Sequence, residues 1–188
     1  MKRLTPGSAE DFFRFFEHIA FADHPEWGCD CYCCFFHADD AAEWEGRTAA
    51  QNRKIAGDMI SLGKMNGLLA YADHEPVGWC NFDAKSKFPG LKLFYPQVIG
   101  DGEEDDIGAV VCFTVAQGFR GQGIARKMLE QACAELKDRG LSIVEAYPAT
   151  ECASDEQNYH GPLGMYLSQG FSVYRRAEKV TVVRKTLR

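Results

Sequence analysis

The sequence predicts one domain of mixed α/β class that spans residues 1–188. Its length and composition, with 46% hydrophobic and 26% charged residues, are typical of a single globular domain with a substantial core. The segment 107–115, IGAVVCFTV, is apolar at both its odd and its even positions, as expected of a central strand buried on both faces. From that strand onward the pattern follows the order β-α-β-α-β-β, and no repeat or Pro/Ser-rich linker marks a boundary.

The first half of the chain predicts two helices and a hairpin. A capping pattern at Ser8, followed by apolar residues at helical spacing, predicts a helix at about 9–21. A second helix is predicted to end at Gly63, because glycine commonly follows the last helical turn. The segments 67–73 and 76–82 are short strand-like runs separated by two residues, which predicts an antiparallel hairpin.

The last third of the chain predicts a strand, a helix and two final strands. The apolar segment 141–147 is typical of a strand. After a polar loop, Pro162 suits a first helical position and Gly170 suits the residue that ends a helix. The remaining segments, near 171–175 and 180–187, predict two strands.

A glycine-bearing turn joins the central strand to the next helix. Gly121 and Gly123 stand at the start of a helix predicted over 124–140, although glycine in a helix costs about 1 kcal/mol relative to alanine. A turn of this kind lets an anion approach unpaired amides at the positive end of the helix dipole. The sequence therefore predicts a phosphate-binding turn, and tight strand-to-helix packing is the alternative.

The spacing of the glycines narrows the choice of phosphate-containing ligand. Arg120 and Arg126 would add positive charge beside it. No Gly-x-x-x-x-Gly-Lys-Ser/Thr run exists, which argues against a P-loop nucleotidase. A dinucleotide fingerprint fits poorly, because Arg126 occupies the place of its third glycine, although Glu145 follows in the next strand.

The residues around this turn resemble the GNAT superfamily of acyl-CoA-dependent N-acetyltransferases. The family's pyrophosphate motif, Gln/Arg-x-x-Gly-x-Gly/Ala, matches 120–125, and its downstream Tyr-x-x-x-Gly-Phe pattern matches 166–171. The resemblance implies a central, mostly antiparallel twisted sheet of about six or seven strands, with splayed central strands and about four flanking helices. It also implies acetyl-CoA as co-substrate.

The resemblance further implies which residues contact the cofactor. Within the family, the backbone of the strand before the motif pairs with the pantetheine arm, and one amide polarises the thioester carbonyl. Matching positions implies Phe113 for the carbonyl and Val115 for the arm. The full implied set is Phe113, Val115, Arg120, Gly121, Gln122, Gly123, Ala125 and Arg126.

Acetyl transfer to an amine needs a proton acceptor and a proton donor near the thioester. Tyr166 matches the family position that commonly supplies the acid, and packing of its ring against the sheet is the alternative. A glutamate that some members carry on the central strand is replaced here by Ala109. Glu145 is a candidate base because burial in an apolar strand would raise its pKa, and His160 is the second candidate. Deprotonation through ordered water stays open.

The predicted activity is transfer of acetyl from acetyl-CoA to a primary amine by direct attack in a ternary complex. A catalytically silent acyl-CoA sensor on the same fold is the alternative. The sequence leaves the acceptor open between a small-molecule amine and a peptide amine, and it leaves a homodimer open.

Composition argues against other classes of partner. A net charge of −6 does not fit sequence-independent nucleic-acid binding. No stretch approaches about 18 uninterrupted apolar residues, and the first residues lack the apolar region of a signal peptide. The eight cysteines are therefore expected as reduced thiols in the cytoplasm. The acidic run at 100–106 indicates a solvated loop, with attraction of a cationic partner as the alternative.

The segment 29–36, CDCYCCFF, gathers four thiols and three aromatic residues. In the family, the loop between the first two helices borders the acceptor pocket. The segment together with Trp27 is therefore interpreted as apolar pocket lining with small buried thiols, or as core. A zinc site is the less favoured alternative, because the thiols are too closely spaced, and no metal is predicted. Its ligands would be Cys29, Cys31, Cys33 and Cys34, and the residues interpreted as core are Cys80, Cys112 and Cys133.

Overall fold

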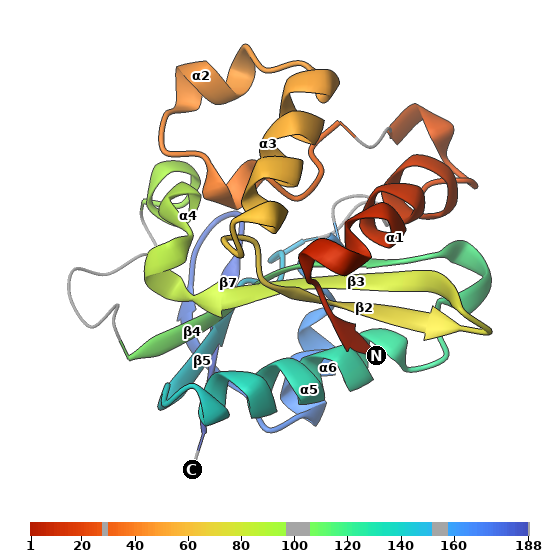
Figure 1. Cartoon of the computed structure of the whole chain (residues 1–188). Helices are drawn as coiled ribbons and strands as arrows, with labels where there is room; N and C mark the ends of the chain where they lie inside the picture. Colours follow the sequence, from red (N-terminus) through yellow and green to blue (C-terminus); the bar gives the residue numbers. More distant parts are fainter. Residues whose placement is uncertain (28–29, 97–105, 152–157, 188) are drawn as a thin grey trace.

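One sheet of seven strands organises the part of the chain that the computed structural model describes, residues 1–27, 30–96, 106–151 and 158–187. The strands lie in the order β1-β2-β3-β4-β5-β7-β6 (Figure 1). Every neighbouring pair is antiparallel except β4 and β5, which are parallel. This mixed, mostly antiparallel sheet confirms the predicted fold class. The strands are Lys2–Arg3 (β1), Gly67–Ala72 (β2), Glu75–Ala84 (β3), Ile107–Val115 (β4), Ile143–Ala146 (β5), Ser172–Arg176 (β6) and Thr181–Thr186 (β7).

Two layers of helices enclose this sheet. Helices α1 and α3 lie over one face, and α5 and α6 lie over the opposite face (Figure 1). The sequence predicts four of the helices but not α2 or α4, which are only 5 and 6 residues long and carry little periodic signal. The described helices are Ala9–Arg14 (α1), Ala41–Glu45 (α2), Ala49–Ser61 (α3), Pro89–Phe94 (α4), Ile124–Asp138 (α5) and Leu163–Ser168 (α6).

The first predicted helix changes its winding partway along. Helix α1 continues into a π-helical turn at Phe15–Ile19, which ends near the predicted boundary. The second predicted helix begins as α3 after a capping box, in which Thr48 and Gln51 each accept a hydrogen bond from the other's backbone N–H. The short edge strand β1 is not predicted, because two residues carry no strand pattern.

A β-bulge in β4 decides which side chains face which helix layer. Asn81 pairs with Cys112 and Phe82 pairs with Val110, so Val111 is the extra residue. Beyond the bulge, Cys112 packs on the face covered by α1 and α3, whereas Phe113 packs on the face covered by α5. The bulge thus lets Val111 and Cys112 pack in one cluster on the same face, and ordinary alternation puts Phe113 on the other face.

The two central strands separate beyond Val110. Strand β5 pairs with β4 from Ile107 to Val110 and ends at Ala146, while β4 continues to Val115. The extension of β4 therefore has one free edge facing the gap left by β5, which is the splay that the fold class implies.

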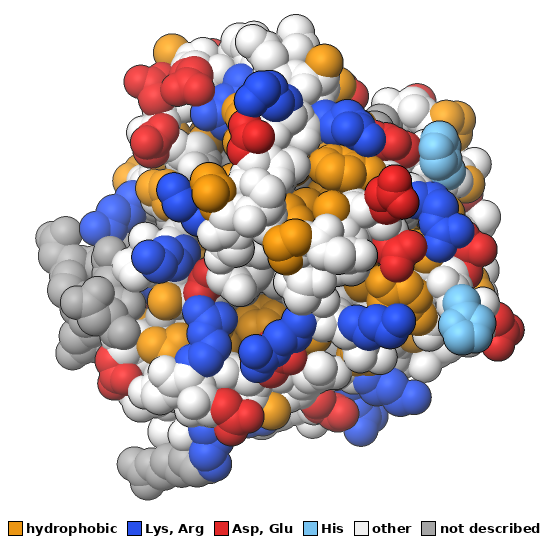
Figure 2. Space-filling view, in the orientation of Figure 1, with side chains coloured by type: hydrophobic (Ala, Val, Ile, Leu, Met, Phe, Trp, Pro, Cys, Tyr) orange, Lys and Arg blue, Asp and Glu red, His pale blue; other side chains and the backbone are white. Residues whose placement is uncertain are grey.

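Charged side chains are dispersed over the face seen in Figure 1. Figure 2 shows Lys and Arg side chains interspersed with Asp and Glu, with apolar side chains exposed between them. Among the described residues, no helix is both long and apolar enough to cross a membrane.

Candidate active site

A cavity of about 800 Å³ opens where β4 extends beyond the end of β5. One part of its wall is the glycine turn with the start of α5, and another is the end of β4 from Cys112 to Val115. The segment around Tyr159 and Pro162 forms a third part. The remaining wall is aromatic and comes from the N-terminal elements: Phe16, Phe21, Trp27, Phe35, Phe36 and Trp44.

The glycine turn has a left-handed backbone at two positions. Gly121 and Gly123 have φ of +72° and +78°, a conformation that other residues adopt at a cost. Atoms placed at either Cβ position would meet nothing within 4 Å among the described residues, so the turn borders open space. No side chain caps the N-terminus of α5, and its first turn carries no acidic residue. Unpaired amides and the helix dipole therefore favour an anion here.

The neighbouring residues of the motif complete the turn. The Gln122 side chain donates to the Gly118 carbonyl at 2.8 Å, which ties the turn to the segment before it. Ala125 lines the cavity in the first turn of α5, where a small side chain leaves the amides accessible. Arg126 also lines the cavity, and its guanidinium forms an ion pair with Glu130 one helical turn away at 3.2 Å.

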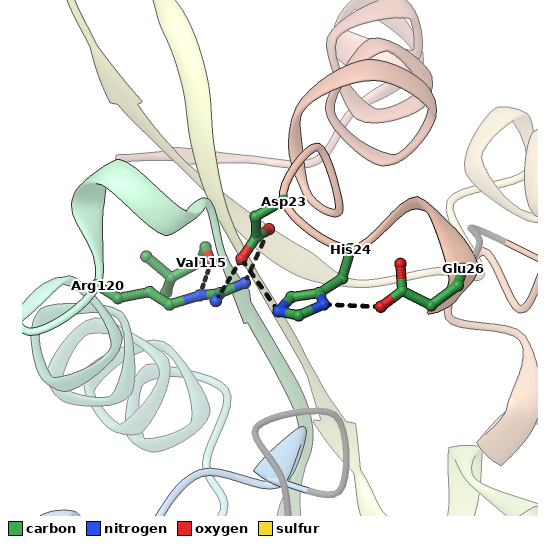
Figure 3. A network of polar contacts seen from close by, with 5 residues as sticks. All are labelled: Asp23, His24, Glu26, Val115 and Arg120. Carbon is green, nitrogen blue, oxygen red and sulfur yellow. Dashed lines mark hydrogen bonds and ion pairs between the residues drawn. The ribbon is translucent and has the colours of Figure 1, made fainter.

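Arg120 is held by partners within the chain. Its guanidinium pairs with Asp23 at 2.8 Å, and its Nε donates to the Val115 carbonyl at 3.0 Å (Figure 3). His24 continues the network between Asp23 and Glu26. The positive charge expected from Arg120 is therefore balanced by Asp23, and the arginine joins the segment after α1 to the end of β4.

The two backbone positions implied for the cofactor are also engaged within the chain. The Phe113 N–H donates to the Tyr159 carbonyl at 2.6 Å across the gap left by β5. The Val115 carbonyl accepts from Arg120, as described above. In this conformation both predicted cofactor contacts of β4 therefore have partners within the chain.

Tyr166 anchors the same segment from behind the cavity wall. Its side chain is fully buried, and its hydroxyl donates to the His160 carbonyl at 2.5 Å. Burial raises the pKa of the phenol well above its ordinary value, so the group stays protonated. Its ring lies 6.5 Å from the ring of Phe113, on the α5 side of the sheet.

These features, a splayed sheet and a glycine turn that opens into a cavity, recur in known proteins. A family model described as "Acetyltransferase (GNAT) family" matches residues 10–171. The chain belongs to the GNAT acetyltransferase family.

Solved structures support this GNAT fold across the whole chain. The GNAT domain of S. lividans PAT is similar with a TM-score of 0.61 and 17% identity, over 99% of this chain and 89% of that one. The Salmonella typhimurium protein yncA, solved with acetyl-CoA, has a TM-score of 0.57 and 14% identity over 100% and 92% of the two chains. The PaiA N-acetyltransferase of Thermoplasma acidophilum, solved with coenzyme A, has a TM-score of 0.52 and 11% identity, over 99% of this chain and 99% of that one. No curated protein is matched by sequence.

The expectation about the pKa of Glu145 in this GNAT protein is wrong. Its carboxylate is buried and contacts Lys85 Nζ at 2.8 Å, Arg184 Nη2 at 2.6 Å and the Tyr147 hydroxyl at 2.8 Å. Burial alone would raise the pKa, but these hydrogen bonds and charges outweigh it and lower the pKa. Glu145 does not line the cavity, so its geometry fits a structural ion pair better than a base.

His160 is likewise enclosed rather than exposed on its loop. The imidazole is 2% exposed, lies tilted against the rings of Tyr159 and Phe36, and has Nε2 3.3 Å from the Tyr95 hydroxyl. Burial lowers its pKa to about 3, so it stays neutral at physiological pH but is a weak proton acceptor. It too lies outside the cavity lining.

The cysteine-rich segment places two of its thiol-bearing residues in the cavity wall, in line with the predicted pocket lining. Cys31 and Cys33 line the cavity, and so does Cys112, which was interpreted as core. Cys29 lies outside the described residues, and among those described no group of three His, Cys, Asp or Glu side chains could hold a metal ion. The sequence pattern does not indicate the β4 bulge, which brings Cys112 beside the N-terminal thiols.

Proposed function

We propose that this protein transfers an acetyl group from acetyl-CoA to a primary amine by direct attack in a ternary complex. The observation that carries the proposal is one continuous cavity with an anion-binding helix terminus at one side and an aromatic pocket at the other. The first part suits the pyrophosphate of the cofactor, and the second suits an acceptor. Strand β4, with its free edge, runs between them.

The cofactor would lie along the turn and the end of β4. Its pyrophosphate accepts hydrogen bonds from the amides that follow Gly121 and Gly123, and its pantetheine arm runs along β4 toward Phe113. Binding then exchanges the Tyr159 carbonyl for the thioester carbonyl at the Phe113 N–H. An amide aimed at the developing oxyanion contributes on the order of 3 kcal/mol to catalysis.

The acceptor side of the cavity favours an amine carried on an apolar body. Rings of Trp27, Phe35 and Trp44 face this space, and Asp30 is also part of the lining. Aromatic faces attract ammonium groups and bury apolar surface, while a carboxylate balances a positive charge. A small-molecule amine with an aromatic or aliphatic body fits these surroundings, and a peptide amine with an apolar side chain shares the same chemistry.

Tyr166 is the proposed proton donor to the departing CoA thiolate. Its raised pKa keeps it protonated. Tyr166 lies behind the cavity lining in this structure, so donation requires both release of the His160 carbonyl and opening of this wall toward the sulfur. Tyr166→Phe is expected to lower kcat by about 100-fold because general acid catalysis is lost. Acetyl-CoA affinity, measured by calorimetry, should be retained. An unchanged kcat would remove Tyr166 from the mechanism.

The variant also loses a buried hydrogen bond, which costs about 1 kcal/mol of stability. Thermal unfolding should therefore be measured beside kcat. A matched control is Tyr174→Phe, because Tyr174 is 51% exposed on β6 and its hydroxyl lies outside the cavity lining. The control should leave kcat and stability unchanged.

The proposal as a whole is tested by titrating acetyl-CoA into the purified protein and then assaying CoA release with a panel of primary amines. Micromolar binding with amine-dependent CoA release is the expected result. Binding without release across aliphatic, aromatic and peptide amines would favour an acyl-CoA sensor. Absence of binding to the folded protein would overturn the assignment of the cofactor.

A further inference from the structure

We propose that the Cys33 thiolate is the general base that takes a proton from the acceptor ammonium. This inference rests on the proposed acetyl transfer and deepens it, since neither Glu145 nor His160 faces the cavity. It is carried by the place of Cys33 in the cavity lining and by the two N–H groups that donate to its sulfur, from Trp79 and Asn81, with the Cys112 thiol as a further partner.

Cys33 lies where the acceptor and the thioester would meet. It lines the cavity between the aromatic wall and β4, and it hydrogen-bonds with Cys112. Cys112 directly precedes Phe113, whose N–H is the amide proposed for the thioester carbonyl. The bulge turns Cys112 toward the α1 and α3 face, so the sulfur of Cys33 is held beside the reacting end of β4.

The hydrogen bonds around Cys33 fit an anion better than a neutral thiol. Trp79 Nε1 donates to the sulfur at 3.0 Å, Asn81 Nδ2 donates at 3.4 Å, and the Cys112 thiol donates as the third group. An indole N–H can only donate, and a neutral thiol is a weak acceptor that carries a proton of its own. A thiolate accepts from these donors better than a thiol does, and Cys33 belongs to the cavity lining.

The orientation of Asn81 is consistent with this assignment. Its Nδ2 also approaches the Cys33 carbonyl and His37 Nε2, each at 3.4 Å. Burial lowers the pKa of His37 to about 4, so the imidazole is neutral and Nε2 can accept. The amide nitrogen therefore has three acceptors at 3.4 Å, one of them the sulfur, whereas the buried Asn81 Oδ1 has no hydrogen-bond partner among the described residues.

The electrostatic surroundings leave Cys33 as the thiol that ionises first. Burial alone would raise its pKa, but the hydrogen bonds from Cys112, Trp79 and Asn81 hold the pKa below its ordinary value. For the buried thiols around it the balance is opposite. Burial and the nearby Cys33 charge raise the pKa values of Cys34 and Cys80, and the hydrogen bond with Cys33, followed by burial, raises the pKa of Cys112.

The backbone at this point is strained. Tyr32 and Cys33 have φ of +39° and +58°, and two consecutive residues other than glycine seldom adopt this region. Surrounding packing must hold them there, because both side chains are buried. Strain of this kind clusters at functional sites, and here it points the sulfur at its three donors.

The proton balance of the step is complete. One ammonium proton passes to the Cys33 sulfur, and the amine lone pair forms the C–N bond to the acetyl carbon. The C–S bond to CoA breaks with its electron pair on the CoA sulfur. A second amine proton ends on that sulfur, with Tyr166 as relay, and the Cys33 proton returns to solvent after the products leave.

The ionisation of Cys33 can be measured without any turnover. NMR of protein labelled at the cysteine Cβ follows each thiol against pH, with Cys33→Ser providing the assignment. Cys33 is expected to titrate below the value of about 8.5 for free cysteine. Cys112→Ala removes one donor and should move the Cys33 midpoint upward by about one pH unit. A Cys33 midpoint above that of free cysteine would overturn the proposal.

The catalytic role is measured by the pH dependence of kcat/KM with an amine from the panel. The acidic limb should follow the Cys33 midpoint, shift with it in Cys112→Ala, and vanish in Cys33→Ser together with about 100-fold of the rate. Cys133→Ser is the control, because Cys133 lies in the α5 core and outside the cavity lining. A Cys33→Ser variant that keeps the wild-type rate and acidic limb would overturn the base role.

Two further outcomes separate this proposal from the proposed function. Incubation with acetyl-CoA alone should leave Cys33 unmodified by mass spectrometry, and an acetylated Cys33 would overturn the base role in favour of a covalent intermediate. A wild type that binds acetyl-CoA but transfers nothing would overturn acetyl transfer itself, whatever the titration of Cys33 shows.

Discussion

We expect Gly123→Glu to abolish measurable acetyl-CoA binding, with the affinity reduced by at least about 100-fold, or roughly 2.8 kcal/mol of binding free energy. Gly123 begins α5 with φ of +78° and borders the open space of the cavity. A glutamate there introduces a carboxylate at the site of the pyrophosphate and repels its charge. It also strains the left-handed turn that aims the first amides of α5. Calorimetric titration of the cofactor into wild type and variant is the measurement.

Gly140→Glu is the matched control for the backbone strain. Gly140 has φ of +88°, follows the opposite end of the same helix, and also borders open space. The control should lose a similar amount of stability, measured by thermal unfolding, and keep the wild-type affinity. Equal affinities in wild type and a folded Gly123→Glu variant would show that the pyrophosphate does not bind at this turn.

Lys85→Met is expected to lower the free energy of unfolding by about 3 kcal/mol, which corresponds to a fall in Tm of roughly 6 to 12 °C. Lys85 and Glu145 form an ion pair at 2.8 Å, with side chains only 5% and 2% exposed. Removal of the lysine leaves a buried carboxylate with less compensation, although Arg184 remains. Chemical denaturation of wild type and variant at neutral pH measures the difference.

Lys87→Met is the control for loss of a positive charge in the same turn. Lys87 is exposed, so its replacement should change stability by less than about 0.5 kcal/mol. Adding Glu145→Gln to Lys85→Met should recover part of the loss, because a neutral amide leaves no unpaired charge. Equal losses in the two lysine variants would contradict a structural role for the buried pair.

The stability that Glu145 contributes depends on pH in a defined direction. Its pKa in the folded protein is lowered relative to the unfolded chain. The contribution is therefore fully present above the unfolded value of about 4.3 and is lost as pH falls through the lower, folded value. The difference in stability between wild type and Lys85→Met should be complete at pH 7 and shrink in acid.

The elements that define the cofactor side could be predicted because their signals are local. The continuous apolar run at 107–115 predicts β4, and the helical spacing of apolar residues after Gly123 predicts α5. Glycine at 121 and 123 permits the left-handed φ observed there, since it has no Cβ to oppose it. Spacing and composition thus predict the mixed α/β class and the glycine turn before α5, and the resemblance to the family adds the form of the sheet.

The roles of the polar groups could not be predicted because their partners lie far along the chain. Glu145 meets Lys85, 60 positions earlier, and this pairing reverses the pKa direction that burial alone would give. Arg120 likewise forms an ion pair with Asp23, a residue far from it along the chain. Hydrogen-bond partners and burial set these properties, and neither is encoded in the pattern of a single element.

The sequence by itself determined the order of strands and helices and the glycine turn, because periodicity and backbone preference act over a few residues. Only the tertiary structure decided which polar groups face the cavity. The bulge at Val111 places Cys112 beside Cys33, and packing against Trp79 and Asn81 surrounds that sulfur with donors. These contacts join segments separated by more than 40 residues, so they exist only once the sheet and the N-terminal helices have packed together.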